Sequence, residues 1–203
     1  MQLMTRRDWL SRVARGLAGL VVVLAGVAAV AADRPDAVII TEPTPALLCT
    51  LFPALARLDQ PPVIVYAAGN EPYITEYLTQ IGAEHVWLID HSQQAPAEWR
   101  KKFETLPGLP ANISLELVRR SWRETESVVL VGDRDADLVV SASLLATARG
   151  IPALCLHEPL DAAQREVIRQ LGVKEIVTIG SNLLRPDDFA GAKLTQLEAV
   201  ANV

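Results

Sequence analysis

Short, continuous apolar runs alternate along the chain with longer stretches in which apolar residues recur every three or four positions. The runs lie at residues 38–40, 63–66, 86–89 and 128–131. Continuous runs are typical of parallel strands covered on both faces, and the longer spacing is typical of amphipathic helices. The pattern therefore predicts an α/β protein with parallel sheets.

Two of the predicted helices have clear start and stop signals. In the second half, Asp161 and Gln164 form a capping pair, and Gly172 suits a left-handed end. In the first half, Pro72 suits a first turn and Gly82 suits the end. The predicted apolar faces consist of Ile74, Tyr77, Leu78 and Ile81 in the first helix and of Ala163, Val167, Ile168 and Leu171 in the second.

The two halves resemble each other when the chain is shifted by 90 residues. The shift places residues 38–40 on 128–130, residues 76–82 on 166–172 and residues 86–89 on 176–179. Such self-similarity is the mark of a duplicated unit. It predicts two tandem Rossmann-like or flavodoxin-like βαβαβ modules, each with a parallel sheet, related by a pseudo-two-fold internal repeat.

These elements divide the mature chain into three segments. Residues 33–118 form a diverged first module, residues 119–127 a linker, and residues 128–203 the second module. After each copy one more strand is predicted, at residues 113–118 and 193–197.

The first 32 residues have the pattern of an export signal. Arg6 and Arg7 give a positive start, residues 16–32 are apolar and uncharged, and residues 30–32 are small, as before a cleavage site. The arginine pair resembles a twin-arginine signal, and an ordinary secretory signal remains open. Cleavage is expected, because the run is short for a membrane span; an uncleaved segment would anchor the protein to the membrane.

Composition excludes several classes of protein. The chain has 203 residues, 50% hydrophobic and 21% charged, with a net charge of −5. Loss of residues 1–32 removes four arginines and one aspartate, leaving 15 basic and 23 acidic residues and a net charge of −8. An acidic protein is a poor partner for nucleic acid.

The cysteines and histidines do not predict a metal site. Two cysteines cannot build a zinc ribbon or a disulfide framework. Cys49 and Cys155 are expected to pack as small buried apolar residues, with a disulfide between them as the alternative. The three histidines lack the spacing of zinc ligands.

Polar residues gather where the strands of the second copy end, and ligands of open parallel sheets bind beyond those ends. The candidate ligand-binding residues are Asp133, Arg134, Asp135, Asp137, Ser141, His157, Glu158, Ser181 and Asn182. The alternative is structural: Asp133 or Asp135 caps a helix, and Asp137 pairs with Arg134. An EF-hand is excluded, because Leu138 and Leu144 occupy its required glycine and glutamate positions.

The first copy offers a different set at the same shift. Glu42, Pro43 and Leu47 stand opposite Gly132, Asp133 and Asp137, and Leu51 adds to an apolar face. Proline lacks the backbone donor that an anionic ligand would use. The second copy is therefore predicted to bind the ligand, and the first to dock against the second module or another subunit.

Several residues of the second half resemble the cell wall-binding repeat type 2 family. The matching positions are Asp133, Ala136, Asp137, Ser141, Ala142, Gly150, Pro152, Leu171 and Gly172. Repeats of this family resemble a strand ending in Gly-Asp, a small-residue helix and a Gly-x-Pro before the next strand. The resemblance implies a non-catalytic module that holds exported proteins on anionic polymers of the cell envelope.

The function predicted from the sequence is an exported, non-catalytic protein that binds cell-wall polysaccharide or another anionic envelope polymer, in the periplasm or at the cell wall. No cofactor, metal or catalytic residue is predicted, and a homo-oligomer stays open. One alternative is a periplasmic receptor with a small ligand between the modules. Another is a metal-dependent hydrolase using Asp133, Asp137 and His157. The basic clusters beside Trp99 and Trp122 could contact a polyanion; the alternative is that they form a solvated surface.

Overall fold

The computed structural model describes residues 34–106, 108, 110–156, 160–180 and 191–197. The predicted export signal at residues 1–32 lies outside the described residues. From Pro35 onward the described chain belongs to one compact unit. None of its described helices is long and apolar enough to cross a membrane.

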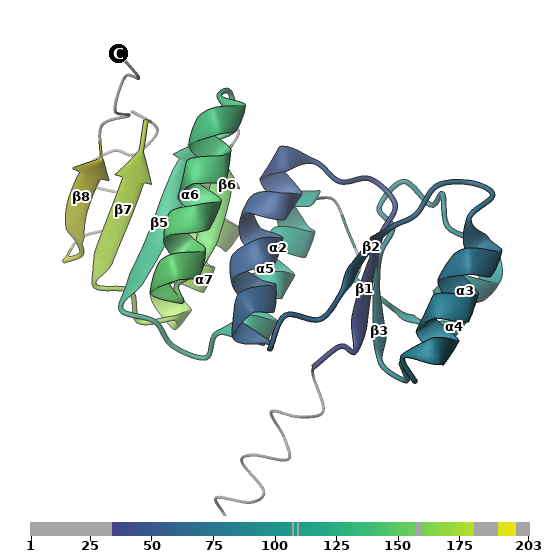
Figure 1. The fold of residues 1–203 in the computed structure, drawn as a ribbon. Helices are drawn as coiled ribbons and strands as arrows, with labels where there is room; N and C mark the ends of the chain where they lie inside the picture. Colours follow the sequence, from purple (N-terminus) through teal and green to yellow (C-terminus); the bar gives the residue numbers. More distant parts are fainter. Residues whose placement is uncertain (1–33, 107, 109, 157–159, 181–190, 198–203) are drawn as a thin grey trace, which may run out of the picture. The chain divides into compact units, whose positions relative to one another are not determined.

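Two four-stranded parallel sheets carry the fold (Figure 1). The first sheet consists of β1 (Ala37–Ile40), β2 (Val63–Val65), β3 (Val86–Ile89) and β4 (Glu104–Thr105), in the order β2-β1-β3-β4. The second consists of β5 (Ser127–Gly132), β6 (Ala153–Leu156), β7 (Glu175–Ile179) and β8 (Lys193–Leu197), in the order β6-β5-β7-β8. The identical order confirms the prediction of two tandem α/β modules.

Helices cover both faces of each sheet (Figure 1). They are α2 (Pro45–Arg57), α3 (Glu71–Gln80), α4 (Ala97–Lys102), α5 (Pro110–Ser121), α6 (Ala136–Arg149) and α7 (Ala162–Gln170). On the first sheet, α3 and α4 cover one face, and α2 and α5 cover the other. On the second sheet, α6 covers one face, and α7 with α5 covers the other.

One apolar cluster joins the two modules. Val38 and Ile40 of the first sheet and Val128 and Leu130 of the second belong to the same buried cluster. The space between the sheets is filled by side chains of α2, α5 and α7. Burying apolar surface is the main favourable term in folding, so each module depends on the other for part of its core. The predicted docking of the first module through its apolar helix, α2, on the second is therefore present.

The helix α2 also covers the open edge of the second sheet. It packs against β6, the outermost strand on that side, and against α6. The hydroxyl of Thr50 donates a hydrogen bond of 2.8 Å to the carbonyl oxygen of Ala153 in β6. Thr50 is fully buried. The contact satisfies an edge carbonyl that no strand pairs with, and it is formed by residues from different modules.

The repeat is in register with a shift of 91 residues at its first strand and helix, not 90. Val38 pairs with Val63, whereas Val129 pairs with Ala153. Since Val63 and Ala153 are 90 residues apart, Val38 corresponds to Val129. The helix caps Thr44 and Asp135 agree with this shift.

The corrected register changes which residues are equivalent at the candidate site. Glu42 corresponds to Asp133, and Ala46 to Asp137. A constant shift of 90 residues placed Pro43 and Leu47 at those positions, because the first module has one residue more than the second between the start of its first helix and its second strand. The first module therefore keeps an acidic residue where the second has Asp133.

The predicted strand at residues 113–118 is wrong, because these residues lie in α5. Ile113, Leu115 and Leu117 alternate with polar residues, which favours a strand. The helix prevails because Ile113, Leu117, Val118 and Trp122 are all buried and recur at helical spacing. The fourth strand of the first sheet is β4 instead. The predicted strand at residues 193–197 is confirmed as β8.

The predicted helix signals are confirmed at their ends and only partly on their faces. Asp161 and Gln164 form a reciprocal capping box, and Gly82 and Gly172 have φ of 64° and 71°. Ile74 and Leu78 of α3 are buried, whereas Tyr77 is exposed. The other residues predicted on these faces divide in the same way: Val167, Ile168 and Leu171 are buried, and Ile81 and Ala163 are exposed.

We predict that Thr50→Val lowers the free energy of unfolding by about 1–3 kcal/mol, because the buried carbonyl of Ala153 loses its donor while side-chain volume is kept. Thr79→Val is the matched control, since the Thr79 hydroxyl donates to Thr75 on an exposed helix surface. Urea denaturation of both variants measures the difference. Equal stabilities would show that the edge contact does not stabilise the fold.

Candidate functional site

The strand order predicts a ligand crevice at the same point of each sheet. In the second sheet, β5 lies between β6 and β7. The connection from β5 leads to β6 on one side, and the connection from β6 leads back to β7 on the other side of β5. Ligands of open parallel sheets bind beyond the carboxyl ends of the strands at such a point. The residues that follow β5 and β7 therefore form the candidate site.

Asp133 lies directly after β5 and is half-buried. Its backbone N–H donates to the carbonyl oxygen of Leu156 at 3.0 Å, which ties the end of β5 to the end of β6. Its carboxylate lies close enough to Cys155 to add to the raised pKa of that thiol, after burial. Asp133 thus has a fixed backbone at the mouth of the crevice.

Asp135 is the N-cap of α6. Its side chain accepts hydrogen bonds from the backbone N–H groups of Asp137 at 3.0 Å and Leu138 at 3.2 Å. Thr44 caps α2 in the same way, accepting from the N–H of Leu47 at 3.2 Å. The structural alternative therefore holds for Asp135.

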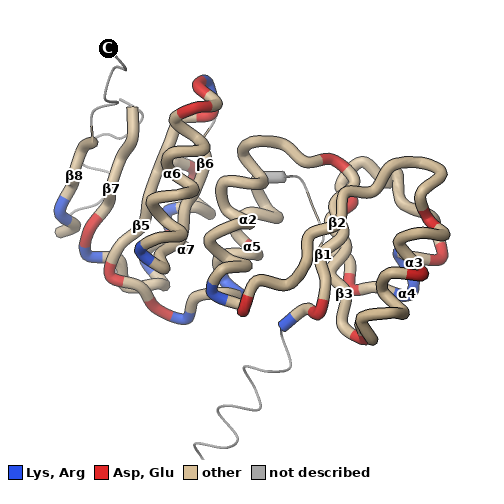
Figure 2. Tube along the Cα trace, viewed as in Figure 1, with Lys and Arg blue, Asp and Glu red and all other residues tan. Residues whose placement is uncertain are grey.

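The remaining described candidates are exposed around the start of α6. Arg134 and Asp137 are exposed, and Figure 2 shows charged residues gathered at this end of the helix. Ser141 is also exposed, but its hydroxyl donates to the carbonyl oxygen of Asp137 at 2.8 Å within the same helix. The candidates His157, Glu158, Ser181 and Asn182 lie outside the described residues.

A leucine lies against the other side of the crevice. Gly180 follows β7 with φ of 63°, and a Cβ atom built there would overlap the side chain of Leu138. Only glycine combines this backbone conformation with such a close neighbour. The strand ends of the second module therefore have an apolar side chain, Leu138, next to Gly180 after β7 and a carboxylate, Asp133, after β5.

At the corresponding strand ends of the first module, a histidine contacts a glutamate side chain. His91 Nε2 lies 3.0 Å from Glu42 Oε2, which links the loop after β1 to the loop after β3. His91 Nδ1 is buried without a hydrogen-bond partner among the described residues. The sequence predicted that the first copy docks and the second binds the ligand, and it did not predict this contact. The sequence held part of the signal, because each residue lies two positions after a predicted strand; that these two strands are neighbours is seen only in the structure.

Asp90 braces the loop beside this pair. Its carboxylate is buried and accepts hydrogen bonds from the N–H groups of Gln94 at 2.7 Å and Ala95 at 3.2 Å. Arg100 lies 3.7 Å from the same carboxylate. Arg100 thus belongs to the internal structure of the first module.

The tryptophans beside the basic clusters are core residues. Trp99 and Trp122 are buried, and Trp122 Nε1 donates to the carbonyl oxygen of Gly150 at 3.0 Å. Arg120 contacts Glu116 and Glu104 and lies over the ring of Trp87. These rings are therefore not exposed stacking surfaces for a polymer.

Both cysteines are free thiols in the structure. Burial raises the pKa of Cys49 to about 12, with a further contribution from Cys155. Burial, followed by the charge of Asp133, raises the pKa of Cys155 to about 12. Over the described residues, no group of three or more His, Cys, Asp or Glu side chains could hold a metal ion.

Comparison with known proteins gives a likeness in fold. The sequence matches no family model and no curated protein. Among solved structures, the cell wall protein Cwp6 from Clostridium difficile is similar, with a TM-score of 0.62 and 14% sequence identity. The similarity covers 82% of this chain and 30% of Cwp6. This chain thus has the fold of a segment of a cell wall protein.

We predict that Asp135→Ala lowers the free energy of unfolding by about 1 kcal/mol, because α6 loses its cap. Asp135→Ser should restore most of the loss, since serine also caps. Arg134→Ala, one position earlier and exposed, is the control and should change stability by less than about 0.5 kcal/mol. Urea denaturation measures all three, and an unchanged Asp135→Ala would contradict the structural role.

We predict that neither thiol of the folded protein reacts with iodoacetamide at pH 8. The thiolate is the reactive form, and a pKa of about 12 keeps both groups protonated at that pH. Intact-mass spectrometry should find no added group on the native chain and two after denaturation in urea. Native labelling at the rate of free cysteine would contradict the buried environments.

Proposed function

We propose that the protein is an exported, non-catalytic protein of the cell envelope, and that its second module binds a hydroxyl-rich cell-wall polysaccharide. The observation that carries the proposal is the segment after β5, where Asp133 and exposed Asp137 flank the helix start and Leu138 of the same turn lies against Gly180 at the end of β7. The carboxylates can accept hydrogen bonds from sugar hydroxyls, and the leucine offers an apolar surface to the face of a sugar ring, so the site suits a polysaccharide.

The fold supports the envelope location. Cwp6 is a cell wall protein, and this chain resembles its fold over 82% of its own length. The sequence pattern around Asp133 and Gly172 also resembles the cell wall-binding repeat type 2 family. The signal-like segment at residues 1–32 agrees with export.

The charge at the crevice favours a neutral polysaccharide over an anionic polymer. Carboxylates accept hydrogen bonds and cannot donate them, so they suit sugar hydroxyls. Three aspartates surround one arginine, Arg134, between residues 133 and 137. The start of α6 offsets part of this negative charge, but a polyanion would still meet like charges. Salt dependence therefore distinguishes the two ligands.

The proposed division of work follows from the contents of the two crevices. In the first module, Glu42 is engaged with His91 across the strand ends. In the second module, Asp137 is exposed in the first turn of α6, where the first module has Ala46. A ligand at the first crevice would have to displace His91 from Glu42, so the second module is the better binding site.

A receptor for a small apolar ligand is the second candidate. A groove of about 260 Å³ runs between α2 of the first module and α6 of the second. Its lining includes one side-chain hydroxyl, that of Ser143. Small-molecule sites usually combine apolar walls with several polar groups that fix the ligand, which favours the polysaccharide proposal.

We predict that the double variant Asp133→Asn, Asp137→Asn binds isolated cell walls at least about tenfold more weakly than the wild type, because charged acceptors form the stronger hydrogen bonds. Co-sedimentation measures the affinity. Glu84→Gln is the control, since Glu84 is exposed at the opposite end of the strands, before β3.

Wild-type binding should persist between about 50 and 500 mM salt, because no polyanion is being neutralised. Binding that is lost over this range would indicate an anionic polymer instead. Absence of co-sedimentation at low salt, or equal binding by the double variant and the wild type, would contradict the proposal. Divalent-metal-dependent release of sugar would favour the hydrolase alternative.

A further inference from the structure

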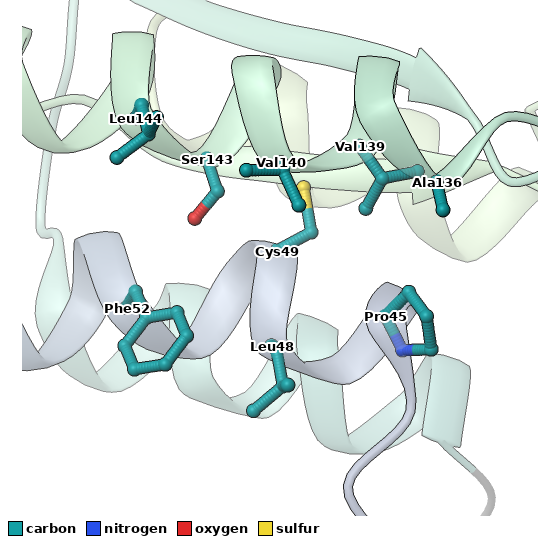
Figure 3. Close-up of a pocket in the computed structure, with 9 residues that line it drawn as sticks. All are labelled: Pro45, Leu48, Cys49, Phe52, Ala136, Val139, Val140, Ser143 and Leu144. Atoms are coloured by element: carbon teal, nitrogen blue, oxygen red, sulfur yellow. The ribbon is translucent and has the colours of Figure 1, made fainter.

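The faces of α2 and α6 that line the groove leave large apolar side chains in contact with water. Phe52 on α2 is 48% exposed, and Val140 and Leu144 on α6 are 56% and 65% exposed. Figure 3 shows the two helices side by side, with Cys49 and Ser143 between them. Exposed apolar patches of this kind mark interaction surfaces.

The groove continues from the helices to the open edge of the first sheet. A second hollow, of about 500 Å³, shares Phe52 and Leu144 with the groove and reaches Val63 at the start of β2. β2 is the outermost strand of that sheet, and Val65 at its end is 51% exposed. The apolar surface is therefore bounded by α6, α2 and a strand edge.

The same three kinds of element already form an interface inside the chain. There, α2 packs on α6 and covers the edge of β6, with Thr50 donating to Ala153. The repeat makes Ser141 of α6 the equivalent of Thr50, and Val63 of β2 the equivalent of Ala153. Ser141 is exposed and β2 lies at the sheet edge. Each chain thus carries both halves of a second interface of the same design.

We propose that two copies of this chain associate, with α6 of each copy packed on α2 and on the β2 edge of the other. The occupant of the groove is then α6 of the partner. The partner's Ser141 hydroxyl, which donates to Asp137 in the single chain, turns to donate to the carbonyl of Val63. Each copy contributes the exposed face of its α6 to one contact, and its α2 with the β2 edge to the other. The contact is closed under two-fold symmetry, the commonest symmetry of soluble oligomers.

The direction of the helices gives the pair a functional consequence. Figure 3 shows Pro45 and Ala136, the first residues of α2 and α6, at the same end of the groove, so the two helices run in the same direction. A two-fold axis parallel to them keeps the starts of both α6 helices on one side. Both candidate crevices then face the same way, and a polymer can contact both at once.

Sedimentation equilibrium of the mature chain tests the association. The expected mass at about 50 µM is that of two chains. Leu144→Glu places a charge in the interface and should weaken association at least about tenfold, with the melting temperature of the monomer unchanged. Tyr73→Glu is the control, because Tyr73 is 74% exposed on α3, outside the groove, and should leave the two-chain mass unchanged.

Mixed cross-linking tests the arrangement. One preparation carries Ser141→Cys and another carries Val63→Cys; the mixture is treated with a short bismaleimide. Cross-linked pairs should form mainly in the mixture, since only there do both cysteines meet across the interface. A monomeric wild type, a Leu144→Glu variant that associates normally, or a mixture without excess cross-linking would each overturn the proposal. The variant Asp133→Asn, Asp137→Asn should still associate, so this test is independent of polysaccharide binding.

Discussion

The open edge of the second sheet is the constraint on which the arrangement of the two modules depends. A four-stranded parallel sheet ends in a strand with unpaired carbonyl groups, and β6 is such a strand. A helix from the other module covers this edge: α2 packs over β6, and the Thr50 hydroxyl donates a hydrogen bond to the carbonyl oxygen of Ala153. Because α2 also packs on its own sheet, it needs apolar residues on more than one side, which explains why it is rich in alanine and leucine.

The loop that starts α6 serves both structure and recognition. Asp135 holds the first turn of the helix through two backbone hydrogen bonds, which fixes the directions of its neighbours. Asp133 is held at the ends of β5 and β6, and Asp137 remains exposed. A cluster of acidic residues thus separates into one that builds the loop and two that can meet a ligand. The first module uses the equivalent position, Glu42, to bind His91 instead.

The sequence was sufficient for most strands, for two pairs of helix ends and for the duplication, because these depend on local patterns. Glycine stops, the Asp161 capping box and continuous apolar strands act within a few residues of one another. Errors arose where distant contacts decide: α5 is a helix because it is buried between other helices, despite its alternating pattern. The register of the repeat and the Glu42–His91 pair also depend on how strands lie next to each other, which one sequence does not encode locally.

The core shared by the two sheets has a consequence for the order in which the chain can fold. Thr50 and Ala153 are 103 residues apart, and α2 meets its second set of neighbours only when β6 is present. While the chain is being synthesised, the first module therefore emerges with one side of α2 uncovered. Contacts between such distant residues slow folding, so stable packing of α2 is a late event that follows synthesis of the second module.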